Sequence, residues 1–309
     1  MIDVPWILGL DGGGTKTVAL AADLAGRTLG RCERGAANYH VVGLSEFAAL
    51  LGSIIEELTH AAGLAGRDLV LISLGLAGAD RPRDRELIQA AIAEQAFTCP
   101  VLVSSDARIA LAAGLGAREE GIVLIAGTGS IAYGVNREGE TIRAGGWGHI
   151  VSDEGSGYDL GRQALARSLR SREGRDKPSL LPAEICRRLD LANLSELVGF
   201  VHNPATTKAD IAALATLVIA AAEQGDALAG DIVDEAAGSL AGLVQSVIDR
   251  GFPGRAAVPV ATYGGLLLGC PQLRCQVADK LAPQAIFLPP GPEPVMGALK
   301  IGYDYLKDG

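Results

Sequence analysis

A pattern of strand, turn, strand, turn and strand occurs twice along the chain and limits the possible folds more than any other feature. Residues 7–31 (ILGLDGGGTKTVALAADLAGRTLGR) and 122–144 (IVLIAGTGSIAYGVNREGETIRA) share an apolar strand, a Gly/Thr turn, a second strand, a polar turn with glycine and a third strand. An internal duplication explains this shared order, and it predicts two glycine-rich turns facing each other across a cleft. Two unrelated β-meanders are the alternative, because short Gly/Thr matches arise easily.

Strands and helices alternate after the first repeat. Apolar runs at 69–76 and 101–104 predict strands, and Ser45 is expected to cap a helix whose apolar residues recur at i, i+3, i+4 and i+7. Further helices are expected over about 81–95 and from Ala107. This alternation indicates an α/β domain with a mostly parallel sheet that begins with an antiparallel meander. The second half is expected to be rich in helices, which are listed here with its strand: helices 182–202, 208–250 and 294–306, and strand 259–263.

Composition and charge exclude several classes of protein. Of 309 residues, 49% are hydrophobic and 41 are glycines, which fits a folded chain with many turns and close contacts rather than a disordered one. The net charge of −9 argues against general affinity for nucleic acid or for an anionic membrane. Five cysteines without a CxxC pair fit a reducing cytosol, and no apolar run reaches the length of a membrane span. We therefore expect a soluble, cytoplasmic protein.

Two glycine-rich turns at strand ends are candidate phosphate loops. Backbone N–H groups of such turns can point at phosphate oxygens, and a threonine adds a hydroxyl donor. Asp11, before the first turn, can hold Mg²⁺ directly or through water. A tight hairpin is the alternative, but it explains one glycine and not three in a row. The candidate residues are Asp11, Gly12, Gly13, Gly14, Thr15 and Lys16 in the first turn, and Gly127, Thr128 and Gly129 in the second.

Asp106 follows the strand VLVSS and opens a helix. Two roles are open to it: helix N-cap, and general base for a hydroxyl group that attacks a phosphate. A carboxylate at the C-terminal end of a strand lies where α/β proteins place their ligands, and the helix dipole favours its ionised form.

The segment GGWGHIVSDEGSG (145–157) suits a sugar ligand. Trp147 is one of only two tryptophans, and among glycines it makes a poor core residue. A flat aromatic ring can contact the CH faces of a sugar while Asp153 or Glu154 binds its hydroxyl groups. An elaborate turn capped by Asp153 is the alternative. Asn38 fits either a sugar partner or a turn residue, and Gly264 and Gly265 would let a flat ring approach the backbone.

Taken together and in this order, the segments DGGGTKT, SSDA, IAGTGS, GGWGH and SDEGSGYDLG resemble the N-acetylglucosamine kinase branch of the BadF-type ATPases. This family is part of the superfamily of sugar kinases, actin and heat-shock chaperones. The resemblance extends over nearly the whole chain, since TYGGLLLG (262–269) and the final VMGALKIG also match family segments.

The resemblance implies two ribonuclease-H-like (actin-like ATPase) domains with a central cleft that closes on ATP and sugar. Domain 1–117 would carry the first phosphate loop and the base Asp106, and domain 118–309, rich in helices, the second loop. The last helix has two placements open to it, in the second domain or packed back on the first. Adenosine would lie near Gly264 and Gly265. The sugar site would be lined by Asn38, Ser130, Gly145, Gly146, Trp147 and Asp153.

The predicted activity is ATP- and Mg²⁺-dependent phosphorylation of the 6-hydroxyl group of N-acetylglucosamine by a homodimer. N-acetylmuramic acid and glucosamine remain open as substrates, because their pockets depend on side-chain placement. A BadF-type ATPase that activates a partner enzyme is the rival from another class, although an activator needs no sugar pocket. We find neither a convincing pair of cluster cysteines nor a Cys-rich zinc motif in the sequence, and no partner other than a small-molecule amino sugar is expected.

Overall fold

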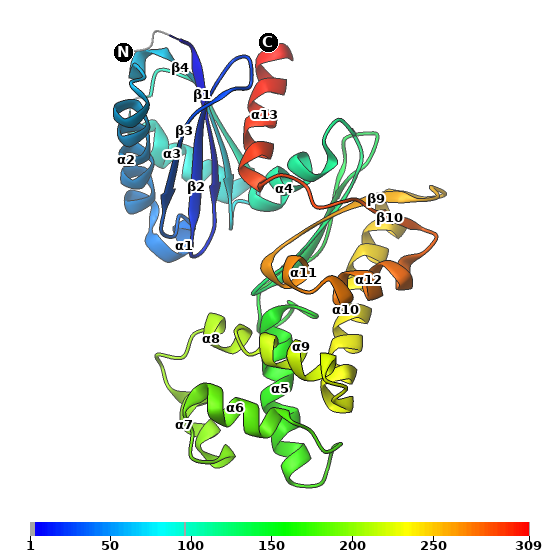
Figure 1. Cartoon of the computed structure of the whole chain (residues 1–309). Helices are drawn as coiled ribbons and strands as arrows, with labels where there is room; N and C mark the ends of the chain where they lie inside the picture. The colour runs from blue at the N-terminus through cyan, green and yellow to red at the C-terminus, as the bar shows by residue number, and fades with distance from the viewer. Residues whose placement is uncertain (1–3, 96, 309) are drawn as a thin grey trace. The chain divides into compact units, whose positions relative to one another are not determined.

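The computed structural model describes residues 4–95 and 97–308, which form two compact units. Unit 1 contains the residues up to Ala117 together with those from Gly291 onward, and unit 2 contains Arg118–Pro290. Figure 1 shows the elements of both units, coloured along the chain. Each unit is built on its own five-stranded sheet.

The sheet of unit 1 has the strand order β3-β2-β1-β4-β5. β1, β2 and β3 are antiparallel neighbours, whereas β4 and β5 run parallel to β1. The strands are β1 (Trp6–Gly12), β2 (Thr17–Asp23), β3 (Thr28–Arg34), β4 (Leu69–Leu76) and β5 (Val101–Ser105). The helices are α1 (Tyr39–Val42), α2 (Leu44–Ala62), the 3₁₀ turn η1 (Gly66–Asp68), α3 (Pro82–Ala93), α4 (Asp106–Leu115) and α13 (Pro294–Asp308).

The C-terminal helix α13 packs on the first unit, against α4, β1 and β4 (Figure 1). Two glycines allow this close approach. A Cβ at Gly297 would lie 1.8 Å from the carbonyl oxygen of Ile109 on α4, and one at Gly9 would lie 2.8 Å from the side chain of Leu299. Glu293, directly before α13, thereby belongs to the same unit as the first glycine-rich turn.

The sheet of unit 2 has the order β10-β9-β6-β7-β8. Its strands are β6 (Gly121–Ala126), β7 (Ser130–Val135), β8 (Thr141–Gly145), β9 (Val258–Tyr263) and β10 (Ala285–Phe287). β6, β7 and β8 form an antiparallel meander, and β9 and β10 are parallel to β6. Strand for strand, this is the order and direction found in unit 1, as an internal duplication requires.

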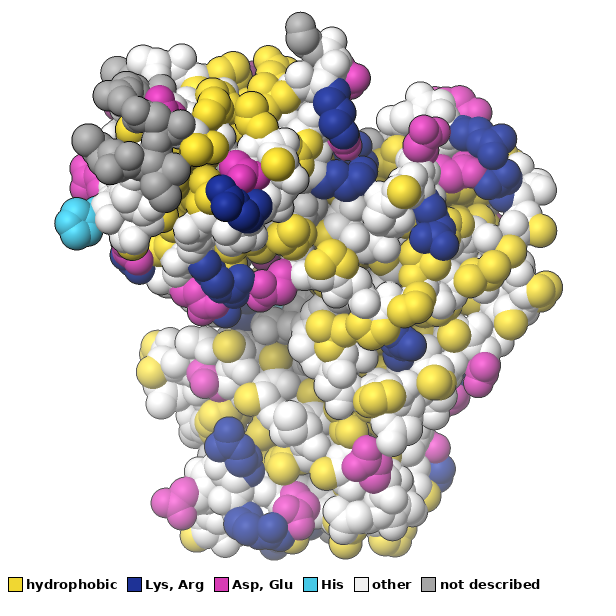
Figure 2. Space-filling model, turned by 45° about the horizontal axis from the view of Figure 1, so that its top comes forward, with side chains coloured by type: hydrophobic (Ala, Val, Ile, Leu, Met, Phe, Trp, Pro, Cys, Tyr) yellow, Lys and Arg dark blue, Asp and Glu magenta, His cyan; other side chains and the backbone are white. Residues whose placement is uncertain are grey.

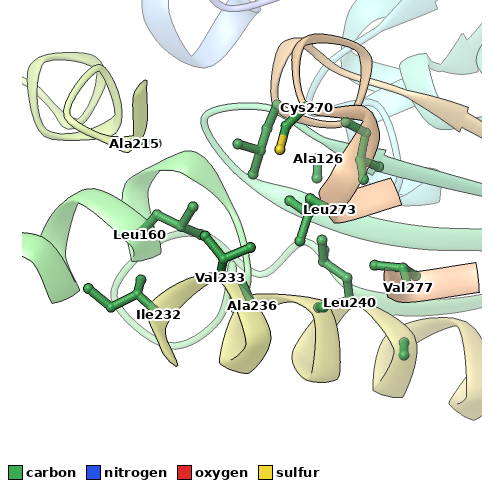
Figure 3. Packing of buried hydrophobic residues seen from close by; sticks show 14 of the residues in the cluster. Ala126, Leu160, Ala215, Ile232, Val233, Ala236, Leu240, Cys270, Leu273 and Val277 are labelled. Carbon is green, nitrogen blue, oxygen red and sulfur yellow. The ribbon is translucent and has the colours of Figure 1, made fainter. Parts of the chain in front are cut away.

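Helices make up most of the rest of unit 2. They are α5 (Gly157–Arg172), α6 (Leu181–Leu189), the 3₁₀ turn η2 (Leu194–Glu196), α7 (Leu197–His202), α8 (Lys208–Ala212), α9 (Ala215–Glu223), α10 (Ala227–Gly251), α11 (Gly265–Gly269) and α12 (Pro271–Leu281). The long helix α10 organises the core. Figure 3 shows Val233, Ala236 and Leu240 on one side of α10, together with Leu273 and Val277 of α12 in the same buried cluster.

The structure corrects some expected element boundaries. Ser45 does not cap α2, because the N-cap is Gly43 and the helix already begins at Leu44. The single helices expected over 182–202 and 208–250 are each divided, the second by turns at 213–214 and 224–226. At Asp226 the side chain accepts a hydrogen bond from the N–H of Ala229, so this residue starts α10 anew.

On the face shown in Figure 2, acidic and basic side chains are interspersed with apolar ones. Within 4–95 and 97–308, no single helix is both long and apolar enough to cross a membrane. The segments Lys208–Glu223 and Ala227–Gly251 meet that test only as a pair bent by 118°. Many apolar residues of α10 are buried in the core of unit 2.

Candidate functional site

The first glycine-rich turn joins β1 to β2, and its three glycines have different surroundings. Gly12 packs tightly, since a Cβ there would lie 2.7 Å from Leu76 and 2.9 Å from Ala37. The N–H of Gly13 donates to the carbonyl of Lys16 at 2.9 Å and closes the turn. A Cβ at Gly14 would have no described atom within 4 Å. Packing and turn geometry thus explain Gly12 and Gly13, whereas Gly14 leaves open space that a ligand could enter.

Two polar residues flank this turn. Lys16 forms an ion pair with Glu33 at 2.9 Å, and its side chain is more than half exposed. The carbonyl of Gly13 accepts hydrogen bonds from the N–H groups of Ala37 and Asn38. Asn38 caps the short helix α1, where its Oδ1 accepts from the N–H of His40 at 3.0 Å. Its amide nitrogen therefore remains the group suited to donate to a ligand hydroxyl.

Asp11 lies at the end of β1, where the local electrostatics disfavour its negative charge. Burial raises the pKa of Asp11 from 3.8 to about 7, and the negative charges of Asp106 and Glu293 add to this effect. Lys16 opposes the pKa shift, but its effect is the smallest of the four. A cation near these carboxylates would therefore be electrostatically favourable.

Mg²⁺ fits this arrangement. It is commonly held by one or two carboxylates together with waters and substrate phosphates, so a dedicated protein cage is not needed. Among the described residues there is no cluster of three or more His, Cys, Asp or Glu side chains that could hold a metal ion by itself. Asp11 is thus the residue of this turn whose oxygen donors suit Mg²⁺.

Asp106 is the first residue of α4, directly after β5, and its N-cap interpretation is wrong. The N-cap is Ser105, whose side chain accepts from the N–H of Arg108 at 3.2 Å. Asp106 Oδ1 accepts from the N–H of Ala107 at 2.8 Å. The carboxylate is therefore held at a helix N-terminus, which stabilises its ionised, proton-accepting form, without being needed as the cap.

In unit 2 three segments interlock around the second glycine-rich turn. The N–H groups of Gly157 and Tyr158, at the start of α5, donate to the carbonyls of Gly127 and Thr128 at 2.7 and 3.2 Å. A Cβ at Gly264 (φ +92°) would lie 2.2 Å from the carbonyl oxygen of Ala126, so only glycine fits there. The beginning of α5 and the Gly264-Gly265 turn thereby fix the shape of this turn.

Asp153 connects the second turn to the segment before α5. It is 6% exposed, it has a φ of +68°, and its Oδ1 accepts from the N–H of Ser130 at 3.3 Å. Burial raises its pKa, and the N–H of Ser130 and the charges of Lys208 and His149 counteract part of that effect. It is not the cap of α5, since Ser156 is. Such a buried carboxylate in a strained backbone is typical of a functional site.

Ser130, which is also expected at the sugar, uses its side chain to bind another part of unit 2. The Ser130 hydroxyl is buried and donates to the carbonyl of Glu154 at 2.8 Å. This hydrogen bond ties the beginning of β7 to the segment before α5.

Trp147 projects from the loop that follows β8. Its side chain is 60% exposed, whereas the other tryptophan, Trp6, is completely buried. Gly145, Gly146 and Gly148 around it have φ angles of +74°, +70° and +91°. A Cβ at Gly146 would lie 2.9 Å from Ile131, so the loop packs closely on β7. The loop thus presents an aromatic ring to solvent, as a sugar-binding residue would require.

A cavity of about 390 Å³ opens beside the second turn. Gly127 and Thr128 line it together with Gly265 and Leu266, and mostly small side chains of α8, α9 and the turn between them form another wall. The residues of that wall are Ala209, Ala212, Ala213, Ala215, Thr216 and Ile219. This is the volume of a small-molecule site, and an adenosine group is of suitable size.

Comparison with known proteins identifies the family. The sequence model of one protein family, the BadF/BadG/BcrA/BcrD ATPase family, matches residues 8–302 of this chain. The chain belongs to this family. This confirms the family resemblance drawn from the sequence motifs.

Two curated relatives of this chain are named as amino-sugar kinases. The N-acetylmuramic acid/N-acetylglucosamine kinase of Clostridium acetobutylicum is 36% identical over 262 residues, which covers 85% of each protein. The N-acetyl-D-glucosamine kinase of Dictyostelium discoideum is 31% identical over 268 residues, or 84% of each.

Solved structures confirm the fold class. A protein from Chromobacterium violaceum, provisionally named as an N-acetylglucosamine kinase, superposes with a TM-score of 0.78 at 25% identity, over 97% of this chain and 99% of that one. A ROK family glucokinase from Streptomyces griseus, solved with glucose and AMPPNP, has a TM-score of 0.59 at 19% identity, over 96% and 98% of the two chains. The two α/β domains of the actin-like sugar kinases are therefore the fold of this family member.

Sequence reasoning missed two groups of residues near these loops. Glu293 forms a bidentate ion pair with Arg31, at 2.6 and 3.0 Å, and its charge raises the pKa of Asp11. The residues next to Asp11 in the sequence give no sign of Glu293, because Glu293 comes close to Asp11 only through the packing of α13 on unit 1. The alanines of α8, α9 and the turn between them carry no chemical signature in the sequence, so their place at the cavity could not be inferred.

Proposed function

We propose that the protein is an ATP-dependent kinase that phosphorylates the 6-hydroxyl group of an amino sugar, with N-acetylglucosamine as the first candidate. Membership of the family supports ATP as the phosphoryl donor. The names of the curated relatives support an amino sugar as the acceptor, and between them they include N-acetylmuramic acid and N-acetylglucosamine.

The observation that carries the proposal is the exposed ring of Trp147 in the same unit as the buried carboxylate of Asp153. A protein that only hydrolyses ATP to drive a partner has no need for an aromatic platform and a hydroxyl-binding carboxylate. A sugar offers an apolar face to such a ring and hydroxyl groups to such a carboxylate.

Each unit would supply a distinct part of the chemistry. In unit 1, the Asp106 carboxylate would accept the proton of the sugar 6-hydroxyl group while the sugar oxygen forms its bond to the γ-phosphorus and the bond from that phosphorus to the bridging oxygen breaks. ADP leaves with the electron pair of that bond. Asn38 would donate to a sugar hydroxyl group, and Thr15 and Lys16 to phosphate oxygens.

In unit 2, the backbone of Gly127, Thr128 and Gly129 would bind the phosphates, while Gly265 and the small side chains of α8 and α9 would accommodate the adenosine. Mg²⁺, bound at Asp11 directly or through water, would neutralise phosphate charge. We further propose that the kinase works in the cytoplasm as a homodimer. Gel filtration with light scattering would test the dimer.

A coupled assay of ADP release tests the function. Purified protein is given MgATP with N-acetylglucosamine, N-acetylmuramic acid, glucosamine or no sugar. We expect release to depend on an amino sugar. Turnover that is indifferent to all three sugars would favour a nucleotide-driven activator instead.

A further inference from the structure

Arg143, on β8, contacts three consecutive residues of the loop that carries Trp147. Its Nε donates to the carbonyl of Gly145 at 3.2 Å, and an Nη2 hydrogen bond reaches the carbonyl of Gly146. Its guanidinium carbon lies 4.3 Å from the centre of the Trp147 ring. We propose that Arg143 is a positioning residue that fixes the Trp147 loop in its sugar-binding shape. This inference rests on the proposed function.

The loop needs such support because its three glycines give its backbone a high conformational entropy before it is fixed. Three glycines surround Trp147, and each of them is in the left-handed region. Glycine reaches that region without a steric penalty, but it also loses the most conformational entropy when it is fixed. The Trp147 side chain gains little from packing, since 60% of it is exposed. Hydrogen bonds to two successive carbonyls and a cation over the ring compensate for this freedom.

Arg143 is itself firmly placed. It is half-buried and pairs with Tyr133 across the β7–β8 ladder. Its carbonyl accepts a hydrogen bond of 2.5 Å from the guanidinium of Arg250, and Arg250 is bound in turn to the carbonyl of Ser246 on α10. The loop is thereby connected to the long helix of unit 2. This gives the ring a fixed orientation before any ligand arrives.

The contacts require the planar fork of arginine. Its N–H groups can reach two neighbouring carbonyls while its flat face lies on an indole ring, whereas a lysine ammonium is a single compact charge. Arg143→Lys should therefore fail to restore the loop although it keeps the charge. The guanidinium covers one face of the Trp147 ring, so the sugar would take the other face.

Sugar kinetics provide the first test, with Arg143→Lys and Arg143→Gln compared with the wild type. Fixing the loop before binding should affect the sugar KM, so we expect it to rise about tenfold in both variants. The kcat and the KM for ATP should stay within about twofold. Arg137→Gln is the matched control, because Arg137 is an exposed arginine in the same unit that pairs with Glu120 at 3.6 Å. A sugar KM unchanged in both Arg143 variants would overturn the proposal.

Fluorescence quenching by acrylamide provides a second test that needs no sugar. The neutral quencher reaches Trp147 but not the completely buried Trp6, and Trp147→Phe shows how much signal Trp6 contributes. Removing the guanidinium from one ring face should roughly double the quenching constant. A lower melting temperature with unchanged quenching would make Arg143 a structural residue only and would refute the positioning role. If wild-type protein phosphorylates no amino sugar, the proposed function fails, while the quenching experiment still reports whether Arg143 holds the loop.

Discussion

The carboxylate of Asp153 lies directly against the Cα of Gly129, so closely that a Cβ at residue 129 would be 2.9 Å from its Oδ2. The N–H of the next residue, Ser130, donates to the other carboxylate oxygen. The phosphate turn and the sugar carboxylate of the proposed function are therefore packed as one piece, and a change in the turn must be transmitted to Asp153.

Gly129→Ala tests this contact. The added methyl group must displace Asp153, and we expect the KM for the amino sugar to rise at least about tenfold, the range for losing one hydrogen bond to a charged group. Steady-state kinetics with varied sugar measure the effect. Gly199→Ala is the control, since a Cβ there meets no described atom within 4 Å.

A double-mutant cycle separates the contact from a general disturbance of the turn. Asp153→Gly removes the carboxylate and tolerates the φ of +68°. In that background Gly129→Ala should change sugar KM by no more than about twofold. An undiminished effect would show that Gly129 acts through something other than Asp153.

Asp106→Asn should abolish most turnover while the fold survives. Asparagine keeps an oxygen that can accept from the N–H of Ala107, and Ser105 still caps the helix. General-base catalysis contributes about 10² to 10⁴-fold, so we expect kcat to fall in that range. Rapid-quench or coupled kinetics, with sugar binding measured by calorimetry, would test this. Asp304→Asn, which changes an exposed carboxylate of the same unit, is the control and should leave kcat unchanged. A nearly full kcat for Asp106→Asn would exclude the base role.

The raised pKa of Asp11 predicts a dependence of stability on pH. Between 3.8 and about 7 the folded protein binds a proton at Asp11 that the unfolded chain has released. The contribution of Asp11 to the free energy of unfolding therefore decreases as pH rises through this window, by at most about 4 kcal/mol for a shift of this size. Urea unfolding at pH 5 and pH 8 should show a smaller difference for Asp11→Asn than for the wild type. An equal difference would show that the folded state does not raise this pKa.

Filling the cavity of unit 2 should weaken nucleotide binding selectively. Ala213, in the turn between α8 and α9, lines the cavity, and Ala213→Leu adds three carbon atoms there. We expect the KM for ATP to rise about tenfold or more while the KM for the sugar changes little. Ala220→Leu, an exposed position of α9 that does not line the cavity, is the matched control. If both variants have normal ATP kinetics, adenosine does not bind in this cavity.

The repeated elements could be predicted from the sequence because their signal is local. The strands that flank Asp11 and Gly127 are apolar runs that end at glycines, and period and turn chemistry identify such runs. The exact first residue of a helix was harder to predict from the sequence. Ser45 and Asp106 are good capping residues by type, yet Gly43 and Ser105 are the N-caps. Which of several neighbouring residues caps a helix depends on the backbone path by which the chain enters it.

Individual side-chain contacts between distant segments could not be predicted, although the packing of the last helix on the first domain was one of its two expected placements. Glu293 reaches the surroundings of Asp11 only because α13 packs on β1 and α4. Arg143 is an ordinary strand residue by composition, and its hold on the Trp147 loop follows from the left-handed path of Gly145 and Gly146. Such relationships depend on tertiary geometry, which residue types and spacing do not encode locally.

The phosphorylated product distinguishes an amino-sugar kinase from an ATPase most directly. Purified protein is incubated with MgATP and N-acetylglucosamine, and the reaction is followed by ³¹P nuclear magnetic resonance. We predict a sugar 6-phosphate monoester that accumulates in step with ADP, with little inorganic phosphate. Inorganic phosphate as the sole product, here and with N-acetylmuramic acid and glucosamine, would contradict the assignment.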